Sequence, residues 1–251
     1  MITQDSILAS LSNTQLSLGT LLIKLHSQGR LRPLVLETLI AQLVREQAQQ
    51  AGLTVSDEEL QTIADVFRRL HGLHTAADTH AWLSARGLTV DGFEVSLEDS
   101  LLAAKLKQHL TAGQVDVYFS AHQSELERLR LAQVLVERDE LARELAIQVR
   151  EDGIDLEGVA REHGLTVTRL QLFRKQLNGS LAEALDAAKT GELIGPLATP
   201  LGFALVVIQE RQPAKLDPVT RQSIQDELFA YWLSDRIKEA AFDLAALEGA
   251  G

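Results

Sequence analysis

The chain has 251 residues, of which 45% are hydrophobic and 24% are charged. A chain of this length and composition can bury one large core or two smaller ones, which excludes general intrinsic disorder. Its 35 acidic residues against 24 Lys and Arg give a formal charge of −11, which disfavours nucleic acids and anionic membranes as partners. The absence of cysteine excludes disulfides, thiolate metal sites and cysteine nucleophiles.

The N-terminal sequence and the hydropathy pattern predict a cytoplasmic chain without membrane insertion. No Lys or Arg precedes Lys24, whereas a secretory signal peptide begins with a basic stretch. The longest uninterrupted apolar stretch, 203–208, is far shorter than the roughly 20 residues that a membrane-spanning helix needs.

Apolar residues at helical spacing predict an all-helical module over residues 1–128. The first clear stripe covers 36–44 and ends at Gly52. Two further helices are expected to begin at capping boxes, which are Ser56 with Glu59 and Asp91 with Glu94. A shorter helix is expected around Trp82.

The apolar period changes after Arg130 and predicts a compact α+β unit over residues 129–214. Strands are expected at 131–136 and 167–173, and an antiparallel hairpin is expected from 193–197 and 203–208. Helices are expected between the strands, over 141–149, over 156–160 and from a capping box formed by Ser180 and Glu183.

A last helix is predicted to begin at Asp217, an N-cap residue followed by Pro218, and its apolar stripe includes Ala241 and Leu244. Because one helix cannot bury a stripe alone, residues 215–251 are expected to pack back on the N-terminal module. The predicted fold class is therefore α+β, mainly α, with a helical module closed by the C-terminal helix and a second domain with a small antiparallel sheet.

This order of elements resembles the SurA family of chaperones, whose members carry parvulin-type (PpiC) peptidyl-prolyl isomerase domains. The local phrases that carry the resemblance are LIAQLV at 39–44, AGLTVSDEEL at 51–60, LQLFRK at 170–175 and GELIGPL at 191–197. The resemblance spans nearly the whole chain and extends to a signal-less, cyanobacterial-type group of relatives. It implies a SurA N-like module over 1–128, a parvulin-like domain over 129–214 and a returning helix over 215–251.

The resemblance places the family's catalytic positions on residues that lack the family's chemistry. Gln133 corresponds to the histidine of the first strand, and Ala204 corresponds to the second histidine. Leu177 and Leu181 correspond to the methionine and phenylalanine of the proline pocket, and we find no counterpart of the family's cysteine or aspartate. We expect isomerase activity to be weak or lost; the alternative is an active parvulin-type peptidyl-prolyl isomerase with an unusual pocket.

Prolyl isomerisation is a rotation with a barrier of about 18–20 kcal/mol, and it requires no metal or cofactor. An apolar pocket that binds the twisted amide more tightly than the planar isomers lowers this barrier without any titratable group. Leu177, Leu181 and Phe203 are the candidates for the floor of such a pocket, and Phe173 is a further candidate for peptide binding. No cofactor is expected.

Other residue clusters have a functional and a structural interpretation. Three histidines near Asp78 suggest a metal site, but a surface turn between helices is the favoured interpretation, so no metal is expected; they are His71, His74 and His80. Three further candidates are the aromatic residues Trp82, Tyr231 and Trp232. Large aromatic residues at helical spacing most often lie in a core, but they are also enriched in binding sites, so these three are candidates for peptide binding. Phe67 joins them as a candidate.

The resemblance implies a protein that binds unfolded or precursor polypeptides. Two classes of role fit this expectation: a chaperone with a broad range of clients, and an accessory of a peptide export or maturation system with one dedicated partner. The acidic net charge favours basic or neutral clients.

Overall fold

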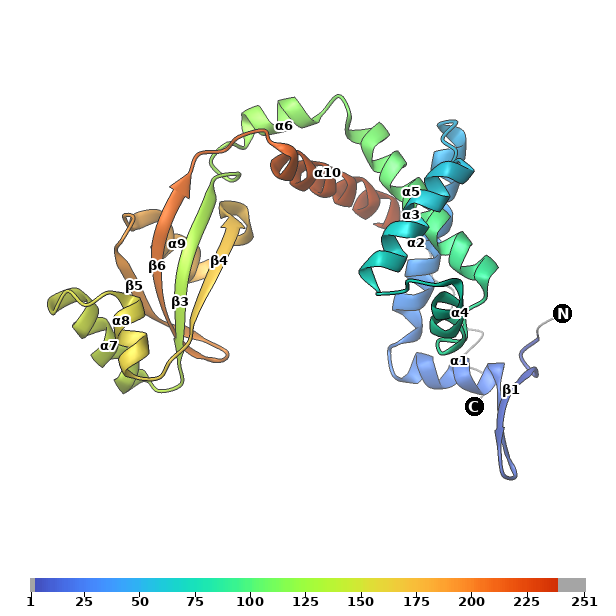
Figure 1. The fold of residues 1–251 in the computed structure, drawn as a ribbon, viewed down its shortest axis with the longest axis horizontal. Helices are drawn as coiled ribbons and strands as arrows, with labels where there is room; N and C mark the ends of the chain where they lie inside the picture. Colours follow the sequence, from blue (N-terminus) through green and yellow to red (C-terminus); the bar gives the residue numbers. More distant parts are fainter. Residues whose placement is uncertain (1–2, 239–251) are drawn as a thin grey trace. The chain divides into compact units, whose positions relative to one another are not determined.

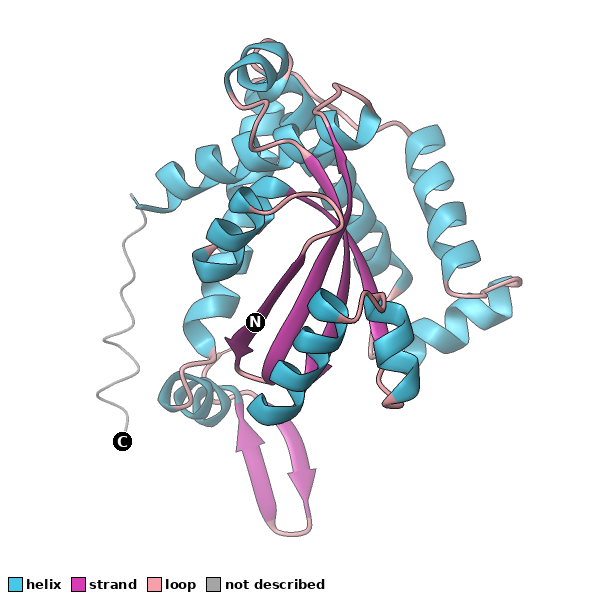
Figure 2. Cartoon of the chain, turned by 90° about the vertical axis from the view of Figure 1, so that its left-hand side faces the viewer, coloured by secondary structure: helices cyan, strands magenta, loops and turns pink. Residues whose placement is uncertain are grey.

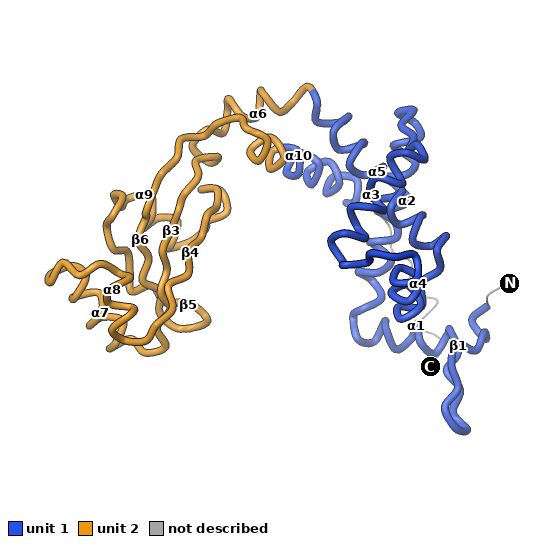
Figure 3. The backbone as a smooth tube through the Cα atoms, viewed as in Figure 1, with its two compact units in different colours: residues 1–112, 225–251 blue, residues 113–224 orange. Residues whose placement is uncertain are grey.

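The computed structural model describes residues 3–238 and divides the chain into two compact units (Figure 3). Unit 1 contains residues 1–112 and 225–251, and unit 2 contains residues 113–224. Ala241 and Leu244 of the predicted last stripe lie outside the described residues. The functional modules expected at 1–128, 129–214 and 215–251 stay a prediction.

The described residues form ten α-helices and two small antiparallel sheets, so the predicted α+β, mainly α class is confirmed (Figures 1 and 2). Every helix within residues 3–238 is either too short or too polar to cross a lipid bilayer.

Four helices of unit 1 are α2 (Leu31–Gln50), α3 (Asp57–Leu70), α4 (Ala76–Ser84) and α5 (Val90–Thr111). The predicted Ser56 cap is confirmed, because the Ser56 hydroxyl accepts from the Glu59 N–H and the Glu59 carboxylate accepts from the Ser56 N–H. The predicted cap at Asp91 is wrong: Thr89 caps α5, and its hydroxyl accepts from the Gly92 N–H at 3.0 Å. The threonine precedes the helix by one residue and so reaches the free N–H groups of the first turn.

The N-terminal module is not all-helical, because β1 (Ile7–Leu11) and β2 (Thr14–Ser17) form an antiparallel hairpin before α1 (Leu18–Ser27). Leu11 pairs with Thr14, so Ser12 and Asn13 form a two-residue turn, and Ser12 has a φ of 53°. Serine and asparagine are frequent turn residues, and they explain locally why the chain forms a hairpin here. The apolar pattern of the sequence predicts only helices for this module.

Unit 2 contains a four-stranded antiparallel sheet in the order β4-β3-β6-β5. Its strands are β3 (Arg128–Val136), β4 (Val167–Phe173), β5 (Leu193–Thr199) and β6 (Gly202–Gln212). The predicted strands and the predicted β5–β6 hairpin are confirmed.

The helices of unit 2 are α6 (Val115–Ala121), α7 (Asp139–Glu151), α8 (Leu156–Glu162) and α9 (Gly179–Ala187), with a 3₁₀ turn at Arg174–Gln176. The predicted capping box at Ser180 is wrong, because Asn178 is the N-cap residue of α9 and makes no side-chain cap hydrogen bond. A left-handed Gly179, with a φ of 60°, starts this helix one residue earlier than the serine.

Alternating residues of the central strands pack on opposite faces of the sheet. Ala132, Val134 and Val136 of β3 contact α7 and α8, whereas Leu129 and Leu131 lie in the core that includes Leu185 of α9. The sheet therefore lies between the α7–α8 pair and α9 (Figure 1).

The last described helix, α10 (Pro218–Lys238), begins as predicted at Asp217, whose carboxylate accepts from the Thr220 N–H at 2.9 Å. This hydrogen bond and a second one from Arg128 lower the pKa of Asp217 to about 2, so the cap is charged at neutral pH. From residue 225 onward α10 belongs to unit 1, where Asp226 forms an ion pair with Lys107 at 2.5 Å.

Candidate functional site

Gln133 and Ala204 lie on the same face of the unit 2 sheet. The β3–β6 register pairs Gln133 with Val206 and Leu135 with Ala204, so Gln133 and Ala204 are diagonal neighbours. Ala204 and Val206 contact the core beneath α9, and strand alternation places Gln133 on that same face. Such a diagonal separates Cα atoms by about 7–8 Å, a distance that long side chains span.

We call this surface the Gln133 face. It consists of Gln133 and the apolar residues around it, which are Leu129, Leu131, Leu170, Leu172, Leu177, Leu181, Leu185, Ile194, Leu197, Ala204, Val206 and Ile208. Gln133 is half-buried and Ala204 is 2% exposed. None of these residues is ionisable, and Thr168 of β4, the cross-strand partner of Gln133, adds an exposed hydroxyl, so the face offers a carboxamide and a hydroxyl in an otherwise apolar setting.

Leu177 follows the 3₁₀ turn and Leu181 lies in the first turn of α9. Both pack against the core of the Gln133 face, as expected for residues that line a pocket there. Phe203 does not join them, because it packs with Leu205 against α7 and α8 on the opposite face. The prediction that Leu177, Leu181 and Phe203 form the floor of one proline pocket is therefore wrong, because they lie on opposite faces of the sheet. The alternation of β6 explains this separation, since Phe203 and Ala204 are consecutive strand residues.

Phe173 ends β4 and is buried. The guanidinium of Arg128 lies 5.3 Å from its ring centroid and the Lys175 ammonium lies 5.7 Å from it. Phe173 therefore serves as a platform for two cations at the end of the sheet.

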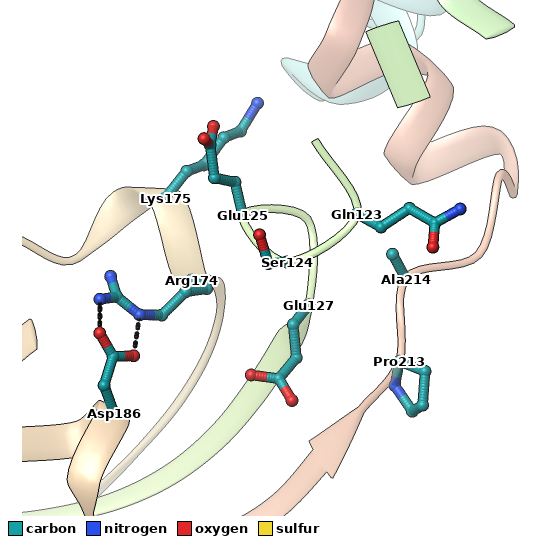
Figure 4. A pocket seen from close by; sticks show the side chains of 9 residues that line it. All are labelled: Gln123, Ser124, Glu125, Glu127, Arg174, Lys175, Asp186, Pro213 and Ala214. Carbon is teal, nitrogen blue, oxygen red and sulfur yellow. Dashed lines mark hydrogen bonds and ion pairs between the residues drawn. The ribbon is translucent and has the colours of Figure 1, made fainter. Parts of the chain in front are cut away.

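A polar pocket of about 630 Å³ opens at this same end of the sheet (Figure 4). Arg174 and Asp186 face each other there and form two hydrogen bonds, which lower the pKa of Asp186. Glu127, on the opposite wall, accepts from Arg211 at 2.9 Å. Arg174, Asp186 and Glu127 are thus paired within the protein. No sequence pattern gathers the separate segments that line this pocket.

A second cavity, of about 670 Å³, lies in unit 1 and is lined by α3, the α3–α4 connection, α4 and the first half of α5. We call it the α3–α5 groove. Its floor consists of the buried side chains Ala64, Leu83, Phe93 and Leu97. Its rim is polar and includes Asp65, Arg68, Arg69, His74, His80 and Glu94.

Trp82 belongs to an aromatic cluster beside this groove. Its ring meets Phe67 edge-on at 5.2 Å, and Phe67 meets Phe93 at 4.9 Å. The Arg86 guanidinium lies over the Trp82 ring, 3.9 Å from the ring centroid. Trp82 and Phe67 are therefore half-buried supports of Phe93 in the groove floor.

The three histidines do not converge on a metal site. His71 stacks on Phe67 at 4.0 Å, whereas His74 and His80 line the groove rim. Asp78 caps α4 through Thr75. Within residues 3–238 no group of three or more His, Cys, Asp or Glu side chains is placed to bind an ion.

Tyr231 and Trp232 occupy different sides of α10, as consecutive helical residues do. Tyr231 is 57% exposed and its hydroxyl donates to Glu227 at 2.9 Å. Trp232 is half-buried and stacks on Phe229 at 5.5 Å. Whether these residues and the Gln133 face bind peptide stays a prediction.

Comparison with known proteins relates the chain to two groups. Residues 110–221 match the family model of the PPIC-type PPIASE domain. The chain is 27% identical over 231 residues to the chaperone SurA of Nitrosospira multiformis, with 78% of this chain and 52% of that protein covered. It is also 27% identical over 229 residues to the chaperone SurA of a Polaromonas species, with 79% and 48% covered.

The chain thus spans about half the length of the curated relatives it matches. Among solved structures, the peptidylprolyl isomerase PrsA from Bacillus cereus aligns with a TM-score of 0.40 and 14% identity, over 96% of this chain and 95% of that one.

Proposed function

We propose that the chain, which is similar to SurA chaperones and carries a parvulin-type domain match, binds unfolded or precursor polypeptides and has weak or no prolyl isomerase activity. Binding is assigned to the α3–α5 groove of unit 1. The Gln133 face of unit 2 keeps the position of the family's site without its imidazoles.

The loss of isomerase activity follows from the chemistry of the Gln133 face. Near neutral pH neither a carboxamide nor a methyl group acts as a general acid or base, and the Ala204 methyl group makes no hydrogen bond. The face therefore cannot build the hydrogen-bonded pair that the family resemblance associates with these two positions. What remains is an apolar surface around Leu177 and Leu181, which can hold a proline ring but has few groups that favour the twisted amide over the planar isomers.

The open α3–α5 groove is the observation that carries the binding proposal. Its apolar floor is accessible from a polar rim, which is the combination typical of sites that accept an apolar side chain and keep the rest of the ligand solvated. Ordering an unfolded client offsets much of the burial energy, so affinity is expected to be weak and broad. The net charge of −11 favours neutral and basic clients at long range.

A charge placed at the groove rim is expected to weaken client binding. Val90 lines the groove, is 39% exposed and is the first residue of α5, a position where an aspartate suits the helix dipole and leaves the fold intact. Val90→Asp should raise the concentration for half-maximal suppression of reduced insulin B-chain aggregation roughly tenfold, because an unpaired polar group against apolar surface costs about 1–3 kcal/mol.

The matched control is Val219→Asp, which makes the same change in the first turn of α10 at a 60% exposed residue outside the groove lining. This variant should suppress aggregation as well as the unmodified chain does. Equal suppression by both variants would show that the groove is not the client site.

A further inference from the structure

The β1–β2 hairpin is the least covered element of unit 1. All five residues of β1 are exposed, and Leu11 reaches 80% exposure. Two backbone hydrogen bonds tether the base of the hairpin to α1, from the Leu18 N–H to Ser6 at 2.9 Å and from the Gly19 N–H to Gln4 at 2.8 Å. Beyond these tethers, no residue between 3 and 30 is buried.

A two-stranded hairpin is marginally stable alone and gains stability from a further strand or a packed layer. The outer edges of β1 and β2 pair with no other strand among the described residues. Natural edge strands are protected by charged side chains or proline, and residues 6–23 contain neither. A register irregularity between Ile7 and Ala9 is the one protective feature that β1 carries in the described residues.

We propose that two copies of this chain associate through this hairpin, with β1 of one copy pairing antiparallel to β1 of the other. Identical antiparallel strands are self-complementary and close the contact as a two-fold symmetric dimer. The pairing uses β1 because its residues are all exposed, whereas Leu16 and Ser17 of β2 are half-buried. The two hairpins then form one four-stranded sheet.

The absence of charge along the hairpin permits a second copy as the occupant. Each chain carries −11, so most of its surface repels another copy, but the uncharged run 6–23 brings no like charges together. The cross-strand pairs Ala9–Leu16 and Leu11–Thr14 also give the hairpin one largely apolar face. Pairing doubles this face within a single sheet.

Sedimentation velocity of the full chain tests the proposal. The unmodified chain should sediment as a dimer at micromolar concentrations. Leu11→Lys should sediment as a monomer with unchanged far-UV circular dichroism, because a lysine on an edge strand opposes pairing with another strand. The matched control, Leu201→Lys, places the same charge on a 75% exposed leucine of unit 2 and should stay dimeric.

A monomeric unmodified chain, or a dimeric Leu11→Lys variant, overturns the proposal. If the unmodified chain is monomeric and Leu11→Lys loses aggregation suppression, the hairpin binds a client strand instead of a second copy, which also overturns it. Because the natural chain has no cysteine, Ala9→Cys gives a second readout: mild oxidation should yield a covalent dimer, and Leu201→Cys should not.

Discussion

Replacing Leu145 with alanine is expected to lower the free energy of unfolding of unit 2 by about 2–5 kcal/mol. Leu145 is fully buried in α7 and packs with β3 and β6 residues in the core on the α7–α8 side of the sheet. Removal of its three outer carbons loses transfer free energy and leaves a cavity that the sheet cannot close. Urea unfolding followed by hydrogen exchange of the β3 amides measures the loss within unit 2.

Ile147→Ala is the matched control, since Ile147 lies two residues further along the same helix and is 52% exposed. Its effect should stay within about 0.5 kcal/mol, as for other surface substitutions. A comparable loss in both variants would contradict the assigned orientation of α7.

Gly202→Ala is expected to destabilise the β5–β6 hairpin strongly. Gly202 has a φ of +120°, and an added Cβ would lie 2.5 Å from the Val136 carbonyl oxygen in the central strand. Positive φ costs an alanine about 1–3 kcal/mol, and the overlap with a strand backbone adds about 1–3 kcal/mol. The measurement is again urea unfolding.

Gly191→Ala separates the two causes. Gly191 also has a positive φ, +87°, but nothing lies within 4 Å of its added Cβ. Gly191→Ala should therefore lose only the part of the unfolding free energy that the positive φ costs. An equal loss of unfolding free energy in both variants would exclude the close approach of Gly202 to β3.

The sequence predicts unit 2 well because its signals are local. The β5–β6 hairpin follows from two apolar runs around a Pro- and Gly-containing turn, and β3 follows from a β-branched run. Caps were less predictable, because several polar residues near each helix start compete for the N-cap: Thr89 replaced the expected Asp91. The β1–β2 hairpin was missed because its apolar residues, such as Ile7 and Leu11, are also compatible with helical spacing.

The candidate sites were predictable to different degrees. The shared face of Gln133 and Ala204 follows from strand alternation once the pairing is known, and the same rule separates Phe203 from Leu181. The α3–α5 groove could not be read from the sequence, because it arises where three helices meet. Four candidate residues indicated that region beforehand, which are Trp82 and Phe67 beside the groove and His74 and His80 on its rim.

The rate of cis/trans isomerisation of a proline peptide, measured in a protease-coupled assay with the full chain, tests the central claim most directly. The account predicts the uncatalysed rate, because Gln133 and Ala204 offer no imidazole pair on the sheet face beneath α9. Acceleration of this rate that is abolished by Leu177→Trp, with aggregation suppression unchanged, would contradict the account and establish an active isomerase.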